Sequence, residues 1–307
     1  MSSRAWALFV AMSLVWGLPY LLIKVAVSEL DPLLVVFARL AMAVVVLAPI
    51  AIFSNSLERT RKSLGRLALV ATVGIILPFL LIAYGEQHIT SSLAALLVAT
   101  DPLFVVLLAL PFDASERPSG LRLIGLLIGL VGVAVLLGLD LSGDAQAALG
   151  ASMVLVAAAC YALSALTVKS LRGVPMLGSV TVTLSLASIL LAPMALTRLP
   201  STLPSLTVLG ALIALGLLCT AVAYVLYFSL IHEAGATRAS IITYVNPAVA
   251  VFLGVLVLAE PLTVGTLVGF GLIVLGCALS TGALRRSPRA VQPRRIASAE
   301  LVEGDVS

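Results

Sequence analysis

The chain has 307 residues, of which 61% are hydrophobic and only 10% charged, with a formal net charge of +4. Soluble domains carry roughly a quarter charged residues. This composition, with a mean hydropathy of +1.20, excludes a soluble globule and predicts an all-α integral membrane protein, because irregular backbone cannot face lipid.

Apolar runs long enough to cross a bilayer follow one another along the whole chain, each near the 20 or so residues that a membrane helix needs. The first run, after Arg4, continues past the length of a signal peptide and has an internal counterpart near residue 148, so it is not expected to be cleaved. The ten predicted spans are residues 5–27, 33–53, 66–85, 92–111, 120–138, 148–168, 176–196, 207–230, 238–258 and 263–283.

The second half of the chain repeats the first at an offset of 145 residues. The matched pairs are Lys24 with Lys169, Trp16 with Tyr161, and Asp101-Pro102 with Asn246-Pro247. A unit with an odd number of spans must enter the membrane the second time from the opposite side. The sequence therefore predicts two inverted five-helix repeats, residues 1–139 and 148–284, joined by an extracytoplasmic linker at 140–147.

Orientation follows from the basic residues. If the N-terminus is cytoplasmic, all of the 18 Lys and Arg residues except Lys24, Arg39 and Arg198 fall on the cytoplasmic side. This bias predicts that both termini are cytoplasmic, in a bacterial inner membrane. Residues 285–307 are polar and basic, which is typical of a disordered tail. The positive charge thus reports topology and gives no reason to expect a nucleic-acid partner.

Short motifs recur in a fixed order along these spans. They are Leu14-Val15-Trp16-Gly17 with Ile23-Lys24, Phe37-Ala38-Arg39-Leu40, and Asp101-Pro102 and Asn246-Pro247 followed by Glu116 and Glu260. The ordered set resembles the EamA type of the drug/metabolite transporter superfamily over residues 5–283. The resemblance implies a ten-helix carrier with a central cavity that exports small metabolites, with aromatic or other neutral amino acids preferred. The chain departs from the family at Leu18-Pro19, where small polar residues are common.

Two prolines near the middle of predicted spans mark a candidate site. Pro102 and Pro247 each leave a carbonyl four residues earlier, on Val98 and Thr243, without its helical partner. Such freed acceptors at mid-depth are typical of transporter binding sites. The alternative is that the kinks only shape helix packing.

Two charged residues lie deep in predicted spans. Burying Asp101 ionised costs about 2.5 to 3.5 kcal/mol, so it should face a wet cavity, meet a cation or take up a coupling proton, unless it makes a helix-packing hydrogen bond. Asn246 occupies the matching position without charge. Arg39 lies roughly 10 Å along its helix from Pro32. It either snorkels to the headgroups or points into the cavity, where it balances Asp101 or clamps a substrate carboxylate.

Aromatic residues complete the predicted site. Trp16, Tyr20 and Lys24 form one stripe, which either walls a cavity or, for Tyr20 and Lys24, anchors the helix at the interface. The predicted substrate-binding residues are Trp16, Tyr20, Arg39, Tyr84, Asp101, Tyr161, Ser240, Thr243, Tyr244 and Asn246, with kinks at Pro19, Pro102 and Pro247.

Other patterns carry no predicted chemistry. Three cysteines within spans lack metal-like or disulfide-like spacing, so neither a metal nor a cofactor is expected. Gly125-x-x-x-Gly129 and Gly265-x-x-x-Gly269 suit close helix packing, as scaffold or dimer contacts.

Three classes of function are compatible with a polytopic chain. An intramembrane enzyme would need a convergent catalytic set, and a channel a ring of like groups. No phosphate-binding loop of the G-x-x-x-x-G-K type is present. The sequence therefore favours a gradient-driven exporter of small molecules over an enzyme or channel, acting in the lipid bilayer as a monomer or homodimer.

Overall fold

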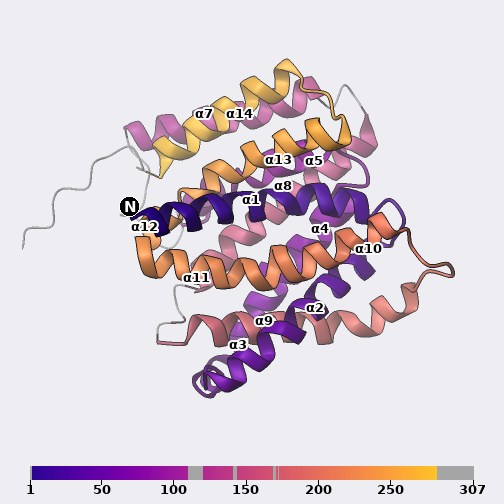
Figure 1. The fold of residues 1–307 in the computed structure, drawn as a ribbon. Coiled ribbons are helices and arrows are strands. Elements are labelled where there is room, and N and C mark those ends of the chain that lie inside the picture. Colours follow the sequence, from indigo (N-terminus) through magenta and orange to yellow (C-terminus); the bar gives the residue numbers. More distant parts are fainter. Residues whose placement is uncertain (1, 110–119, 141–143, 169–170, 172, 282–307) are drawn as a thin grey trace, which may run out of the picture.

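The computed structural model describes residues 2–109, 120–140, 144–168, 171 and 173–281 (Figure 1). Within these ranges every regular element is a helix, so the all-helical prediction is confirmed for them. Among the described residues, eight helical segments are long and apolar enough to cross a membrane, and two apolar helices, Ile242–Leu258 and Val264–Ser280, are shorter. Glu116, Lys169 and the predicted tail 285–307 lie outside the described residues.

The helix bounds fall within a few residues of the predicted spans. They are α1 (Ser3–Ala26), α2 (Pro32–Phe53), η1 (Glu58–Ser63), α3 (Leu64–Ala71), η2 (Thr72–Ile76), α4 (Leu77–Gly85), α5 (Ser91–Val98), α6 (Asp101–Ala109), α7 (Leu121–Asp140), α8 (Ala145–Val168), α9 (Met176–Ala195), η4 (Leu196–Arg198), α10 (Leu206–Ile213), η5 (Ala214–Val222), α11 (Ala223–Ala234), α12 (Ala236–Ala239), α13 (Ile242–Leu258) and α14 (Val264–Ser280).

Local sequence explains where several helices begin. The Asp31 side chain accepts from the backbone N–H of Leu33, and Pro32 opens α2, where its missing N–H costs no helical bond. Thr90 caps α5 and Ser205 caps α10 in the same way. These caps satisfy N–H groups that would otherwise lack partners at the helix ends.

The two mid-span prolines act differently. The fourth span is broken at Ala99 and Thr100, so Pro102 falls in the first turn of α6, a position that tolerates proline. Pro247 instead lies inside the continuous helix α13. Pro102 therefore follows a break between two helices, whereas Pro247 lies within one helix. Thr100 helps to close the break by donating from its hydroxyl to the Leu97 carbonyl.

Two spans contain a π-helical stretch, η2 between α3 and α4 and η5 between α10 and α11. A π-turn widens the helix by one residue and is frequent at functional sites. Both stretches face the centre of the bundle, because residues of each line the central cavity described below.

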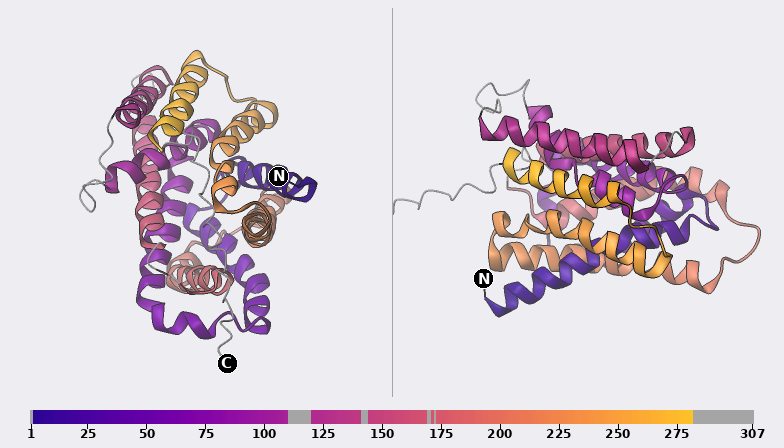
Figure 2. Two further views of the ribbon diagram at one scale, coloured as in Figure 1. Left: turned by 90° about the vertical axis from the view of Figure 1, so that its left-hand side faces the viewer. Right: turned by 90° about the horizontal axis from the view of Figure 1, so that it is seen from above.

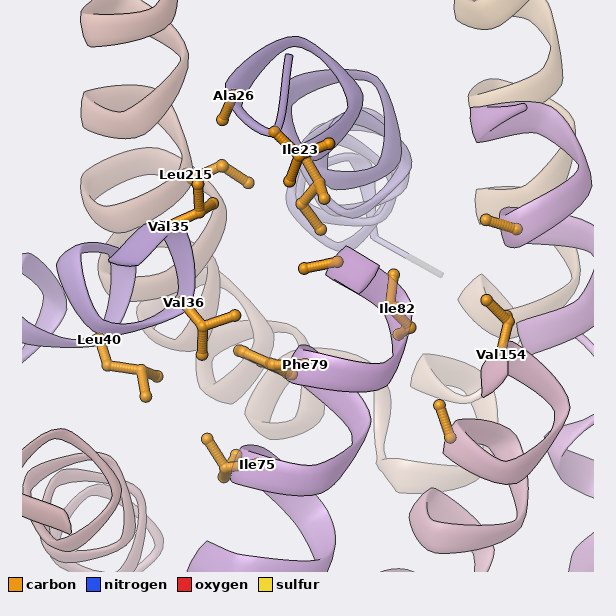
Figure 3. Close-up of a cluster of buried hydrophobic side chains, with 14 of the residues drawn as sticks. Ile23, Ala26, Val35, Val36, Leu40, Ile75, Phe79, Ile82, Val154 and Leu215 are labelled. Atoms are coloured by element: carbon orange, nitrogen blue, oxygen red, sulfur yellow. The ribbon is translucent and has the colours of Figure 1, made fainter. Parts of the chain in front are cut away.

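The bundle is organised in helix pairs (Figures 1 and 2). The helices α7 and α14 lie side by side at one edge, and α2 packs on α9 at the opposite edge. Between them, α1 packs on α13 and α11, and α8 packs on α4. Figure 3 shows the apolar core where Ile75, Phe79 and Ile82 of η2 and α4 meet Val36 of α2 and Ile23 of α1. We call the end of the bundle that holds the N-terminus proximal, and the end at which α1 finishes distal.

Glycines set the spacing of the α7–α14 pair. A Cβ atom on Gly276 would overlap the backbone of Gly129, and one on Gly132 would meet the backbone of Ile273. The small-residue faces predicted as scaffold or dimer contacts thus include residues that pack within the chain.

We expect Gly276→Ala to force these two helices apart and to destabilise the protein by about 1 to 3 kcal/mol, the usual cost of overpacking. Thermal unfolding of the purified protein measures this. Gly271→Ala on the same helix is the matched control, because no atom lies within 4 Å of its added Cβ. Equal unfolding temperatures for the two variants would contradict the expected clash.

Candidate functional site

A cavity of about 510 Å³ lies in the middle of the bundle. Its lining comes from most helices of the described chain, but from no described residue of α7 or α14. Several predicted site residues line it: Trp16, Pro19, Tyr20, Arg39, Asp101, Tyr161, Thr243, Asn246 and Pro247.

The remaining predicted residues lie elsewhere. The Tyr244 hydroxyl is 3.2 Å from the Thr281 hydroxyl, at the side of α14. Tyr84 lies near the distal end beside Asp31, and Ser240 is exposed ahead of α13. Pro102 is not part of the lining. Sequence spacing could not give the rotation of a helix about its axis, or the residue at which a helix such as α13 begins.

Arg39 points into the bundle. Its side chain is only 8% exposed, and its Nε donates to the Thr220 hydroxyl oxygen at 2.9 Å. The guanidinium carbon lies 4.2 Å from the centre of the Phe79 ring, within the range of a cation–π contact. The structure therefore favours the cavity over the headgroups for this residue. Among the described residues, Asp101 forms no ion pair with Arg39.

An aromatic wall stands on the proximal side of Arg39. The Trp16 ring is 4.8 Å from the Tyr227 ring, tilted by 41°, and 6.4 Å from the Tyr224 ring in an edge-on arrangement. Tyr20 and Tyr161 contribute two further rings to the same cavity. Pockets with aromatic walls and a few polar groups suit solutes that are partly apolar.

Two polar side chains in the lining have unused acceptors. The Oδ1 atoms of Asp101 and Asn246 are buried without a hydrogen-bond partner among the described residues. A buried polar atom without a partner costs free energy. A solute or water that donates a hydrogen bond at this position would recover that cost.

Several residues of the cavity lining were not predicted from the sequence. Phe79 carries the Arg39 contact, and Thr220 carries its hydrogen bond. Ser164 and Thr183 add hydroxyl groups to the wall. A hydroxyl residue inside an otherwise apolar run is the available signal. It is weak, because such residues also bond to the carbonyl of the preceding turn, as Thr183 does with Ser179.

The distal end of the cavity is closed by polar contacts. Glu260 accepts from the backbone N–H and hydroxyl of Ser91, at 2.7 and 2.9 Å, and from those of Ser92, at 3.0 and 2.5 Å. Its carboxylate thus sits at the N-terminus of α5, where the helix favours negative charge. Lys24 donates to the carbonyl oxygens of Glu86 at 2.5 Å and Ile89 at 2.7 Å.

Glu86 lies in the turn between α4 and α5 and is fully buried. Neither of its carboxyl oxygens has a hydrogen-bond partner among the described residues. Burial raises the pKa of this carboxyl well above its usual value, although nearby Lys24 opposes the shift. The exposed Glu29, in contrast, has a lowered pKa because the backbone N–H of Ser205 donates to it.

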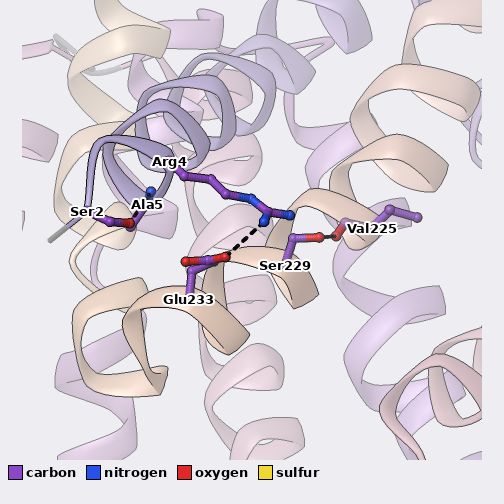
Figure 4. A network of polar contacts seen from close by, with 6 residues as sticks. All are labelled: Ser2, Arg4, Ala5, Val225, Ser229 and Glu233. Atoms are coloured by element: carbon purple, nitrogen blue, oxygen red, sulfur yellow. Dashed lines mark hydrogen bonds and ion pairs between the residues drawn. The ribbon is translucent and has the colours of Figure 1, made fainter.

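The proximal end is less enclosed. The lining reaches Val168 at the end of α8 and Met176 at the start of α9, both at this end. A surface ion pair between Arg4 and Glu233, at 3.3 Å, ties the start of α1 to α11 (Figure 4). The cavity therefore extends toward the proximal end and is sealed distally.

Comparison with known proteins places this geometry in a family context. The pattern described as the EamA-like transporter family matches residues 4–138 and, a second time, residues 148–282. The chain is similar to an uncharacterized transporter of Archaeoglobus fulgidus, at 28% identity over 89% of this chain and 97% of that protein. It is 31% identical to the uncharacterized inner membrane transporter YedA of Escherichia coli K12, over 90% of this chain and 89% of that one.

Two more distant similarities extend the comparison. An S-adenosylmethionine/S-adenosylhomocysteine transporter of Chlamydia muridarum is 26% identical over 86% of this chain and 87% of that protein. A crystal structure superposes with a TM-score of 0.64 at 19% identity, covering 92% of this chain and 98% of the other, which shows a shared fold.

Proposed function

Because the chain belongs to the EamA-like transporter family, we propose that it is a gradient-driven carrier whose solute binds in the central cavity and meets the two sides of the membrane alternately. The observation that supports this is the cavity itself: polar groups at mid-depth inside aromatic walls, sealed distally and extended proximally. This is the arrangement that a carrier needs in one of its two states. The proximal side is proposed to be cytoplasmic, in a bacterial inner membrane.

We propose that ten crossings form two inverted repeats. Two features support this, because they recur when each residue is replaced by the residue 145 positions away in the other half. The packing of α8 on α4 matches that of α1 on α11, while α2 with α9 and α7 with α14 pair counterpart helices. The π-helical η2 likewise falls at residues 217–221, inside η5.

The solute is proposed to be a neutral amino acid with an aromatic or other apolar side chain, carried outward. Arg39 lines the cavity and its Nε is held by Thr220, so its two terminal nitrogens are proposed to bind a carboxylate. The free acceptors of Asp101 and Asn246 suit an ammonium group. The rings around Trp16 suit the apolar side chain.

A second candidate is an S-adenosyl amino acid, favoured by similarity to the chlamydial transporters. Such a solute carries the same carboxylate and ammonium groups, with a purine ring that could stack on the aromatic wall. Both candidates would place their carboxylate on Arg39, so variants of Arg39 do not distinguish them, and competition between the two solutes for transport does.

Flux measurement tests the proposal. Purified protein in liposomes should exchange labelled L-phenylalanine or S-adenosylmethionine saturably. The better substrate of the two should inhibit exchange of the other at the lower concentration. Asn246→Ala removes hydrogen-bonding groups from the lining and should raise the KM for the transported probe about tenfold with little change in maximal rate, the loss expected for roughly one hydrogen bond.

Gln87→Ala is the matched control, because Gln87 is an exposed amide outside the cavity. Its kinetics should equal those of the unmodified protein. Non-saturable flux of both probes, or an Asn246→Ala variant with unchanged KM, would contradict the proposed site.

A further inference from the structure

We propose that Glu86 is the proton-binding residue of this carrier: it takes up a proton when the distal end of the bundle closes and loses it when that end opens. The inference rests on the proposed function, since it requires a protein that opens alternately at two ends. It concerns a group outside the cavity lining, and it makes the opening of the distal end depend on the protonation of a named side chain.

The Glu86 carboxyl is buried and accepts no hydrogen bond within the described part of the chain, which supports the proposal. Glu86 is fully buried, and both carboxyl oxygens lack a hydrogen-bond partner among the described residues. An ionised carboxylate in such a place would lose its hydration without gaining donors, a cost that protonation avoids. The nearby carboxylate of Glu260 is different, because four donors from Ser91 and Ser92 hold it.

The charged and titratable neighbours do not replace the missing donors. Lys24 on α1 lies close enough to oppose the raised pKa, but its amine is bonded to the Glu86 and Ile89 carbonyls and forms no ion pair with the carboxyl in the described structure. Arg39 on α2 acts in the same direction as Lys24 but more weakly, and Glu260, from the turn after α13, repels.

Two further titratable groups lie nearby. Tyr20 on α1 interacts electrostatically with Glu86, and His88, in the turn that holds Glu86, is exposed. Where α8 packs beneath the turn, it presents Gly150 and Val154 to Gly85.

The same contacts make this turn the seal of the cavity. Ile82 of α4 and Ile23 of α1 line the cavity, and Glu86 and Lys24 follow directly beyond them on the distal side. Opening the distal end must separate Lys24 from the turn between α4 and α5. That separation exposes Glu86 to water, where its carboxyl recovers an ordinary pKa and releases the proton.

Opening of the distal end should depend on pH. The pKa of Glu86 is higher in the closed state than in the open state. Protonation of Glu86 therefore stabilises the closed state fully at pH values below the ordinary pKa range of a glutamate. This stabilisation is lost as the pH rises through the raised pKa. High pH should therefore open the distal end.

Thiol labelling tests this without a known solute. One variant carries Ile89→Cys, a buried position in the seal, and a second carries Gln87→Cys, an exposed position in the same turn. The ratio of their labelling rates cancels the intrinsic pH dependence of thiols, and the chain without added cysteines gives the background of the native three. The ratio should rise by at least about tenfold between pH 5 and 9, since each unit of pKa shift changes the equilibrium tenfold.

Glu86→Gln, which imitates the protonated acid, should make the ratio low and independent of pH. Glu58→Gln, at an exposed glutamate of η1, and His88→Gln should keep the rise. If Glu86→Gln does not elute as a single folded species, Glu86→Asp is the test. Its shorter side chain holds the carboxyl at a different depth, so the pH midpoint of the rise in the labelling ratio should shift. A rise that survives Glu86→Gln, a midpoint that Glu86→Asp leaves unchanged, or no rise in the unmodified background would each overturn the proposal. None of these outcomes depends on flux, so a failure to transport either probe is a separate result.

Discussion

Arg39→Lys is expected to reduce transport of the accepted probe by about 10 to 100-fold in kcat/KM, although the positive charge is kept. A hydrogen bond to a charged group contributes about 1.5 to 3 kcal/mol, and lysine loses the fork that would reach a carboxylate while Nε holds Thr220. The flat guanidinium is also what stacks on Phe79. Initial rates of uptake into liposomes at a range of probe concentrations measure the effect.

The matched control is Arg59→Lys, at an exposed position of η1. It changes the same chemical group without touching the cavity and should transport normally. Normal transport by Arg39→Lys as well would remove Arg39 from the site and leave it as a packing residue.

The second large effect is expected for stability. Glu260→Ala removes the acceptor for two backbone N–H groups and two hydroxyls at the start of α5, all buried. Each lost hydrogen bond to the charged group costs about 1.5 to 3 kcal/mol, so losing even the two backbone bonds destabilises the protein by roughly 3 kcal/mol or more. Thermal unfolding of the purified protein should show a clear fall in the midpoint.

Glu29→Ala provides the comparison, because Glu29 also accepts a backbone N–H at a helix start, that of Ser205, but in full contact with solvent. Its removal should change the unfolding midpoint little, since water replaces the lost bond. A Glu260→Ala protein that unfolds like Glu29→Ala would show that the buried carboxylate is not needed to hold α5.

Much of the fold could be predicted from the sequence because lipid leaves the backbone few choices. Apolar length alone located helices such as α2 and α9 to within a few residues. Pro102 shows the limit: a proline signals a disturbance, but whether the helix bends or restarts depends on the turn before it, here closed by Thr100. The π-helical stretches left no mark that residue type or spacing could reveal.

The site was predictable in part. Polar residues stranded in apolar spans, such as Arg39 and Asn246, line the cavity because lipid excludes them. Tyr244 lies outside the cavity lining because an aromatic residue also packs well against a neighbouring helix, where its hydroxyl lies 3.2 Å from that of Thr281. Glu86 lies at the end of a span, where polar residues collect, and only the three-dimensional structure shows that its carboxyl is buried.

The paired π-helical stretches also bear on the history of the chain. A π-turn can be regarded as an α-helix that has gained one residue, and η2 and η5 carry it at matching places in the two halves, both of which match the same family pattern. Two independent insertions at one place are a less economical origin than a single insertion followed by copying. Deleting one residue from η2 would restore a regular α-helix and turn Phe79, with everything beyond it, by roughly 100° away from Arg39.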